Sequence, residues 1–349
     1  MVTDNKYTVA TGVIHIHTLD SDGTKTHDEV AAIGNELGLD FLLFSDHMTL
    51  QSFDEGKEGY YDDILVLIGY EHNDLDDCNH YLIFDLDKVL PAASSPADYV
   101  RIAAERGALG IMAHPDEIRG RDARFRSYPW TAWDVTGFNG LEIWNQMSEW
   151  TELLKFFNQI MMVFSPRKCL RSPTRRILRK WDELSAQGRV AGIGSVDAHG
   201  FLYRAGPLRL TIFPYKVQFK SIRTHLLLDR PLSKDLPEAK KQVYRAIRDC
   251  RAFVSNYRWG EAENFHFEIA GSSDTAISGD QITLGGTTEA RITAPLKGRI
   301  RLIGNGLVVA EQTGREFSHR LTEPGVYRAE VYRGKKGWIF SNHIRVNEA

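Results

Sequence analysis

Histidines and acidic residues recur at the ends of apolar runs between residues 12 and 200. The first of these motifs is His15-x-His17 in the run VIHIHT, and side chains two residues apart on a β-strand point to the same face. Two neutral imidazoles placed in this way can chelate one divalent ion. Asp22 follows in an Asp-Gly turn, where a carboxylate suits a ligand from the loop. Taken alone, an HxH pair is a weak signal, because most such pairs are incidental.

Histidine, aspartate and glutamate also occur at the ends of several further apolar runs. The whole set is therefore a much more specific signal for a metal centre than the HxH pair alone. Its members are His15, His17, Asp22, His47, Glu71, His80, His114, Asp197 and His199. They include six of the 12 histidines, whereas histidines buried for packing alone would be scattered through helices and loops. The sequence therefore predicts a metal centre made from these residues. Asp46, directly before His47, is expected to orient a ligand.

The elements that must position these residues alternate between two patterns. Short β-rich runs such as FLLFSDH and ALGIMAHP alternate with helical segments such as THDEVAAIGNELG. Strands separated by helices of about ten to fifteen residues indicate βα units around a mostly parallel sheet. In a parallel barrel, the carboxyl ends of the strands meet at one edge, where the chemistry is built. A helical insertion at 148–188 interrupts this alternation.

The last part of the chain has a different pattern. After the helix PEAKKQVYRAIRDCRAF come short β-rich runs separated by Gly-rich turns, which is typical of a small antiparallel β-sandwich. We therefore expect an α/β fold with a first domain at 1–258 and a β-sandwich domain at 264–349.

The motifs, in this order, resemble the polymerase and histidinol phosphatase (PHP) family. The matching text is HIHTLDSDG, LLFSDH, GYEH, NHYL, MAHP and SVDAHG, and it covers roughly residues 12–200. The resemblance implies a distorted (β/α)7 barrel that holds two or three divalent metals per chain, with zinc, manganese or iron as candidates. It also implies hydrolysis of a phosphate ester by metal-activated hydroxide.

Carried over residue by residue, the resemblance implies three ion positions. The first would be held by His15, His17, Glu71 and Asp197, the second by Glu71, His80 and His114, and the third by Asp22, His47 and His199. Glu71 would thus be shared by two ions, and Asp22 stands where some relatives have histidine. Glu71, Asp197 and His199 are the expected catalytic residues, and either His199 or a metal-bound water could act as the general acid.

Candidate substrate contacts follow two of the ligand motifs. Arg119 and Arg121 leave the His114 strand in a basic loop that could clamp a phosphate, and Arg204 follows His199. The alternative is a solvated loop whose arginines pair with nearby acidic residues. Glu142 and Asn145, in the run GLEIWN, could also face the site.

The tail carries a second, shorter resemblance, to the branch of the same family that includes a carbaryl hydrolase. The closing strand of that branch commonly reads W-x-x-SNPI, and here Trp338 is followed by SNHI, with His343 in place of proline. The resemblance implies that the bond cleaved could belong to a carbamate, amide or ester.

Composition excludes several other classes of protein. With 349 residues, 42% of them hydrophobic and 26% charged, the chain is not largely disordered. No apolar run approaches the ~20 residues of a membrane span, and no secretory signal is visible. Cys78, Cys169 and Cys250 form no CxxC pair, so we expect a cytoplasmic protein.

We therefore predict a metal-dependent hydrolase, with a small phosphorylated molecule as the favoured substrate. The alternatives are a carbamate, amide or ester hydrolase, an exonuclease, and a non-enzymatic scaffold or binding protein. A net charge of −3 disfavours nucleic acid, because proteins that track phosphates normally have a basic groove.

Overall fold

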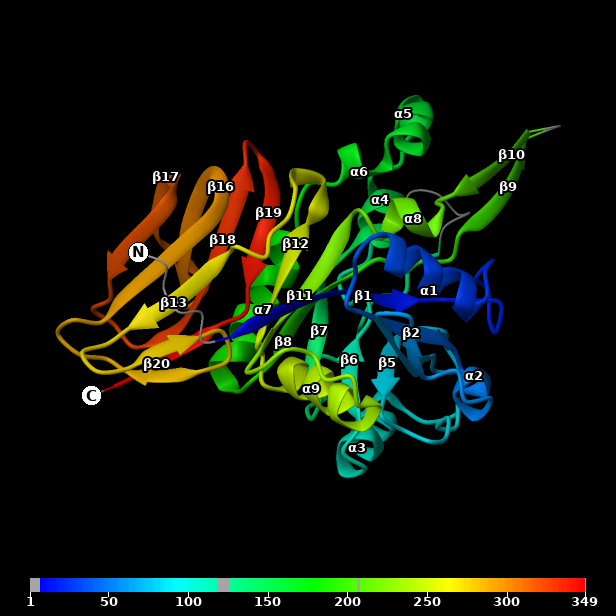
Figure 1. The fold of residues 1–349 in the computed structure, drawn as a ribbon, viewed down its shortest axis with the longest axis horizontal. Helices are drawn as coiled ribbons and strands as arrows, with labels where there is room; N and C mark the ends of the chain where they lie inside the picture. Colours follow the sequence, from blue (N-terminus) through cyan, green and yellow to red (C-terminus); the bar gives the residue numbers. More distant parts are fainter. Residues whose placement is uncertain (1–6, 119–125, 206–207, 349) are drawn as a thin grey trace.

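The computed structural model describes residues 7–118, 126–205 and 208–348. A mixed β-sheet with its helices lies on one side of the molecule, and the C-terminal strands lie on the other (Figure 1). The strands of the first sheet are β1 (Thr8–Ile16), β2 (Phe41–His47), β4 (Ile64–His72), β5 (Tyr81–Phe84), β6 (Leu109–Met112), β7 (Gly140–Asn145), β8 (Ala191–Ser195) and β11 (Ile222–Leu228). Several are buried on both faces, which is why they read as continuous apolar runs.

Neighbouring strands of this sheet follow the order β11–β1–β2–β4–β5–β6–β7–β8. The β1–β2, β2–β4, β6–β7 and β7–β8 pairs are parallel, whereas β5 and β11 run antiparallel to their neighbours. The sheet is therefore mixed, and less parallel than the sequence predicted. One reason is the short 73–80 connection between β4 and β5, since a parallel crossover needs about a dozen residues or more.

The two ends of the sheet meet without a full ladder. Ile16 and Ala198 form an isolated parallel bridge. Around it, the Val196 and Ala198 amides donate to the carbonyls of Ile14 and His15 at 3.2 Å each, and His17 N donates to Ala198 O at 2.9 Å. A closed (β/α)7 barrel is thus not confirmed. These bonds nevertheless bring the His15–His17 segment beside the 196–199 segment.

Capped helices cover this sheet. Helix α1 (His27–Glu36) begins with a capping box, in which Thr26 and Glu29 exchange side chain to backbone hydrogen bonds. Ser95 and Asp235 cap α3 (Pro96–Glu105) and α9 (Leu236–Arg248), and α9 buries Val243 and Ile247 against the sheet. The short elements of this part are α2 (Gln51–Asp54), β3 (Gly59–Tyr61) and α8 (Tyr215–Gln218).

The predicted helical insertion consists of several short helices and one long one. They are α4 (Gln146–Leu153), the 3-10 segment η1 (Phe156–Asn158), α5 (Gln159–Phe164), α6 (Pro166–Cys169) and α7 (Arg175–Gln187). The hairpin of β9 (Phe201–Ala205) and β10 (Leu208–Ile212) projects from the body near α4 and α8 (Figure 1). None of the helices in the described ranges has the length and apolar character that a membrane crossing requires.

The C-terminal part has its own apolar core, which includes Phe267, Ile292, Leu302 and Trp338. Strand β12 (Ala252–Asn256) and η2 (Tyr257–Trp259) lead into this part, and its elements are β13 (His266–Ala270), β14 (Thr275–Ile277), β15 (Gln281–Thr283), β16 (Glu289–Gly304), β17 (Leu307–Arg320), β18 (Gly325–Arg333), β19 (Lys336–Ser341) and β20 (Ile344–Asn347). The pairings around β16 and β18 are antiparallel, as predicted, whereas β15 pairs with β20 in parallel. Strand β12 pairs with both β11 and β19, so the ladders of the two parts are continuous.

Asn342, between β19 and β20, attaches the C-terminal part to β8. Its Oδ1 accepts a hydrogen bond from Gly192 N at 2.8 Å, and its Nδ2 donates to Gly192 O at 2.8 Å and to Ala252 O at 3.0 Å. Because a side-chain amide offers the same donor and acceptor as a peptide group, Asn342 pairs with β8 as a neighbouring strand would.

A buried ionic network lies at the same junction, on α7 and β18. Arg328 donates to both carboxylate oxygens of Asp182, at 2.7 and 3.0 Å, and to Glu330 at 2.6 Å. His343 Nε2 lies 2.7 Å from Asp182 Oδ1, so the residue that replaces the proline of the resemblance belongs to this network. Burial alone would raise the pKa of Asp182, but the bonds from His343 and Arg328 outweigh it and lower the pKa to about 2.

Candidate metal centre

All nine predicted ligands come together around one cavity of about 210 Å³ or in the wall directly behind it. His15 and His17 lie at the end of β1, His47 and Glu71 near the ends of β2 and β4, and Asp197 and His199 after β8. Asp22 is exposed and His47 is half-buried, whereas the other seven are buried. The structure thus groups these side chains as predicted. Their binding of metal stays a prediction.

Glu71 lies at the middle of the group. Its Oε2 lies 3.1 Å from His15 Nε2, 3.3 Å from His17 Nε2 and 3.3 Å from His47 Nδ1. Its Oε1 lies 2.8 Å from His80 Nδ1 and 3.1 Å from His114 Nε2. Burial alone would raise the pKa of Glu71, but the surrounding imidazoles hold it well below its ordinary range. An ionised carboxylate whose two oxygens face different imidazole sets suits a ligand shared by two ions.

Asp197 approaches the same group from the opposite end of the sheet. Its Oδ1 lies 3.4 Å from His15 Nε2, 3.3 Å from His17 Nε2 and 3.5 Å from His199 Nδ1. The bonds between the 196–198 segment and β1 fix this approach. The donors therefore fall into overlapping sets, of which Glu71, His80 and His114 form one, and His15 belongs to two others with Glu71 or Asp197.

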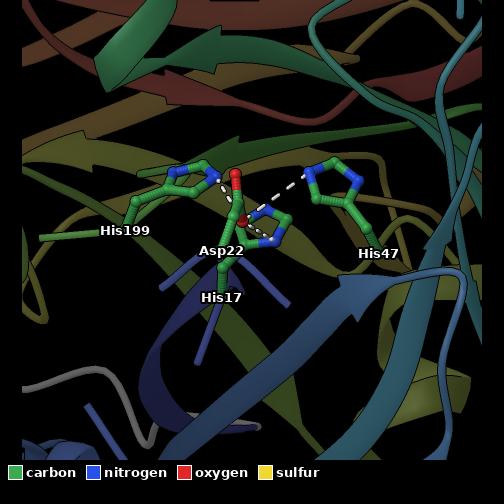
Figure 2. A group of neighbouring side chains, drawn as sticks. All are labelled: His17, Asp22, His47 and His199. Atoms are coloured by element: carbon green, nitrogen blue, oxygen red, sulfur yellow. Dashed lines mark ion pairs between the residues drawn. The ribbon is translucent and has the colours of Figure 1, made fainter. Parts of the chain in front are cut away.

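Asp22 completes a further set at the rim of the cavity. Its Oδ1 lies 3.2 Å from His199 Nε2, 3.6 Å from His17 Nδ1 and 3.9 Å from His47 Nε2, and all three rings surround it (Figure 2). Aspartate thus reaches the imidazoles from the Thr18–Gly23 loop. The structure adds His17 to the Asp22, His47 and His199 set that the resemblance implied.

His17 provides the test of whether these residues fit a metal. Both of its ring nitrogens are fully buried, and neither makes a well-aligned hydrogen bond to a described residue, although Nε2 lies 3.3 Å from Glu71 Oε2 and from Asp197 Oδ1. Burial, and then the neighbouring His199 and His47 rings, lower the pKa of His17 to about 3, so its ring is neutral. A buried polar group without a partner is costly, and a neutral imidazole with a free lone pair is the form that binds divalent ions. The donor set therefore fits Zn²⁺, Mn²⁺ or Fe²⁺.

The backbone is strained at three of the nine residues. His15, His114 and Asp197 have φ of 68°, 29° and 53°, in the left-handed region that residues with a Cβ seldom adopt. Each such residue costs on the order of 1–3 kcal/mol and persists only where surrounding contacts impose it. The strain therefore coincides with the residues that meet at the centre.

Outer contacts orient several of the imidazoles. Glu142 Oε1 lies 2.7 Å from His15 Nδ1, and its Oε2 accepts from His114 N at 2.7 Å and from Asn145 Nδ2 at 2.9 Å. The sequence suggested that Glu142 and Asn145 face the site, and the structure brings both to its outer side.

Two further residues were missed. Asn73 Oδ1 lies 3.1 Å from His47 Nδ1, and Asp77 Oδ1 lies 3.3 Å from His80 Nε2. The polar run NDLDD between Glu71 and His80 is the signal that could have indicated them.

Asp46 was predicted to orient a ligand, and the structure shows contacts through which it could do so. It accepts hydrogen bonds from Thr18 N at 2.7 Å, Thr18 Oγ1 at 2.8 Å and Ser21 Oγ at 2.6 Å. These bonds hold the loop that carries Asp22, and the orienting role of Asp46 stays a prediction.

Of the three predicted substrate contacts, the structure describes only Arg204. Arg119 and Arg121 lie outside the described residues, and Arg204 is exposed on the β9–β10 hairpin rather than in the lining of the cavity. The described lining contains no lysine or arginine. Two aromatic rings that the sequence did not indicate flank the centre. Tyr128 stacks on His80 at 4.8 Å between ring centres, and Phe201 stacks on His199 at 4.5 Å.

Replacement of Glu142 by glutamine is expected to weaken metal binding about 10- to 100-fold, because outer partners of metal-binding histidines contribute that much. Glutamine keeps the size of the side chain but loses the charge beside His15. Equilibrium dialysis of the purified chain against Mn²⁺ would measure the change. Glu149→Gln is the matched control, since Glu149 bonds to Trp144 and not to a predicted ligand. Equal affinity in the wild type and Glu142→Gln would contradict this role.

No family model matches the chain, and no curated protein matches it. Among solved structures, it is similar to a two-domain protein containing a predicted PHP-like metal-dependent phosphoesterase from Bacteroides vulgatus, at 14% identity and a TM-score of 0.46. That alignment covers 98% of this chain and 97% of the other.

A second similar structure, from Bifidobacterium adolescentis, is provisionally assigned as a metal-dependent phosphoesterase. It has 16% identity and a TM-score of 0.38, and the alignment covers 60% of this chain and 94% of that one. Neither is described as a carbaryl hydrolase, and that part of the resemblance stays a prediction. At these identities and TM-scores, function must be argued from the residues of this chain.

Proposed function

We propose that this chain is a metal-dependent hydrolase of small phosphate esters. The observation that carries the proposal is Glu71, a buried ionised carboxylate whose two oxygens face two different sets of imidazoles. Two divalent ions at such a centre favour hydroxide at neutral pH and neutralise charge on phosphoryl oxygens. A two- or three-ion centre held by the nine predicted ligands would supply this chemistry.

The residues around the ions would have distinct roles in the reaction. Glu71 and Asp197 hold the imidazoles in one cluster and balance the charge of the ions. Glu142 keeps His15 in one orientation through the bond to its Nδ1. His199, in the lining of the cavity, would pass a proton to the leaving oxygen where only two ions are bound, because a third ion at the Asp22 position would occupy its ring nitrogen.

The cavity favours a small substrate. Its volume of about 210 Å³ is below the roughly 300–1,000 Å³ of sites for drug-sized ligands. Its described lining has no lysine or arginine to follow a nucleic-acid backbone, which disfavours an exonuclease. Tyr128 and Phe201 provide apolar surface for the group that leaves.

A carbamate or carboxyl ester is the second candidate substrate. The same lining has several carboxylates and no described cation besides its histidines, so a phosphate dianion depends on bound ions for its charge balance. An uncharged carbamate has no such requirement. The non-enzymatic alternative, a scaffold, predicts fewer than about one bound ion per chain, because an unused centre would not hold its metals.

Turnover on three matched nitrophenyl substrates would test the proposal: a phosphate monoester, a phosphodiester and a carbamate. The chain would be loaded with Mn²⁺ or Zn²⁺, and His114→Ala would serve as the blank. We expect phosphate turnover that is lost in the variant. Turnover of the carbamate alone would replace the phosphate proposal with the second candidate, and no turnover in any arm would favour the scaffold.

A further inference from the structure

A second group of ligand-type side chains lies where the loop at 18–23 meets α1 and β2. It consists of Asp20, His27 and Asp46, whose candidate ligand atoms lie within 4.8 Å of one another. None of them is among the nine predicted ligands. His27 is the first residue of α1, and Asp46 is near the end of β2. His27 is 2% exposed and Asp46 is 4% exposed, whereas Asp20 is half-buried.

Hydrogen bonds around Ser52 determine which nitrogen of His27 carries the proton. The hydroxyl of Ser52 donates its proton to Asp20 Oδ2. The same hydroxyl lies 3.1 Å from His27 Nδ1, and its only proton is already used. His27 Nδ1 must therefore donate to Ser52. In a neutral ring, this leaves the lone pair on Nε2.

That lone pair faces another acceptor. His27 Nε2 lies 3.8 Å from Asp46 Oδ2, which is too long for a hydrogen bond, and it has no hydrogen-bond partner among the described residues. Burial lowers the pKa of His27, which favours the neutral ring. The ammonium group of Lys57, whose charge reaches His27, pairs with Glu55 at 2.7 Å. A buried nitrogen lone pair and a carboxylate oxygen thus face each other with no described cation between them.

We propose that a divalent cation binds between His27 Nε2, Asp46 Oδ2 and a carboxylate oxygen of Asp20. Nitrogen and oxygen ligands lie about 2.0–2.2 Å from Zn²⁺, so two donors 3.8 Å apart can share one ion. One imidazole and two carboxylates suit Zn²⁺ or Mn²⁺.

This site is separate from the centre of the proposed function and goes beyond it. Its ion would join α1 and β2 to the loop that Asp46 already holds through Thr18 and Ser21. Since that loop carries Asp22, the ion would stabilise the rim of the main centre.

Counting bound ions tests the proposal without reference to turnover. The full chain would be stripped with a chelator, dialysed to equilibrium against Mn²⁺ or Zn²⁺, and analysed for metal per chain. We expect His27→Gln and Asp20→Asn each to hold one ion fewer than the wild type. His225→Gln should hold the wild-type number, because His225 is buried between Thr11 and Ser255, away from both sites.

A second measurement locates the ion directly. Crystals soaked in Mn²⁺ and recorded near its absorption edge should show anomalous density between His27 Nε2 and Asp46 Oδ2, and Asp20→Asn should remove it. If His27→Gln does not fold, the number of ions bound by Asp20→Asn alone tests the proposal. Equal metal content in the wild type and Asp20→Asn, or density of water alone at this position, would overturn the proposal.

Discussion

Replacement of Glu71 by alanine is expected to lower kcat/KM about a thousandfold or more, which corresponds to about 4 kcal/mol of transition-state stabilisation. The reason is that Glu71 contacts five imidazoles, three through one oxygen and two through the other. Loss of the Glu71 carboxylate would remove the contact to both groups of imidazoles at once. His80→Ala removes a ring that contacts only Oε1, so its effect should be smaller.

Steady-state kinetics on the substrate from the nitrophenyl panel, with metal analysis of each variant, would measure both effects. Glu71→Ala should lose more metal than His80→Ala while its circular dichroism stays unchanged. Equal losses of activity and metal in the two variants would contradict the sharing of Glu71 between two ions.

Replacement of Arg328 by alanine is expected to lower the free energy of unfolding by about 3–5 kcal/mol, which is typical when one partner of a buried ion pair is removed. Arg328 is 2% exposed and donates to both oxygens of Asp182 and to Glu330. Without it, two buried carboxylates lose their main partner. Urea unfolding would measure the change, and Arg315→Ala, at an exposed position on β17, should stay within about 0.5 kcal/mol.

The same variant should change the response to acid. The pKa of Asp182 falls from its ordinary value of 3.8 to about 2 in the folded chain. Its contribution to stability is therefore complete above pH 3.8 and is lost as the pH falls toward 2. Arg328→Ala should weaken this part of the acid dependence. An unfolding free energy equal to that of the wild type would show that the network contributes nothing net.

The ligands of the candidate centre were predictable because their chemistry depends on residue type and on position at strand ends. Alternation along a strand predicts that His15 and His17 share a face, although the positive φ of His15 interrupts the end of β1, and Glu71 ends a clearly apolar run. The contact of Glu142 with His15 was not predictable, because 127 residues separate them and no local pattern records the pair. For the same reason, the sequence indicated that His343 was unusual but not that it contacts Asp182, 161 residues away.

The architecture was predicted less completely than the centre. Alternating strands and helices indicated an α/β fold, but they do not specify the direction of β5 or how β8 meets β1. The contact between β8 and β1 depends on hydrogen bonds of residues that follow β8, such as Ala198. These bonds leave no periodic pattern of apolar residues in the sequence. Asp46 shows the same limit within the site, since the sequence predicted that it orients a ligand but not that its hydrogen bonds go to Thr18 and Ser21 in the loop that carries Asp22.

The pairing of Asn342 with Gly192 has a consequence for how the chain unfolds. Strand β8 ends at Ser195, two residues before Asp197. Loss of the Asn342 hydrogen bonds to β8 would therefore also disturb the end of the sheet where Asp197 lies. We therefore predict that the boundary near residue 258 does not separate two parts that unfold independently. We expect one calorimetric transition for the whole chain, and a chain cut after residue 258 should expose the edge of β8 and aggregate through it.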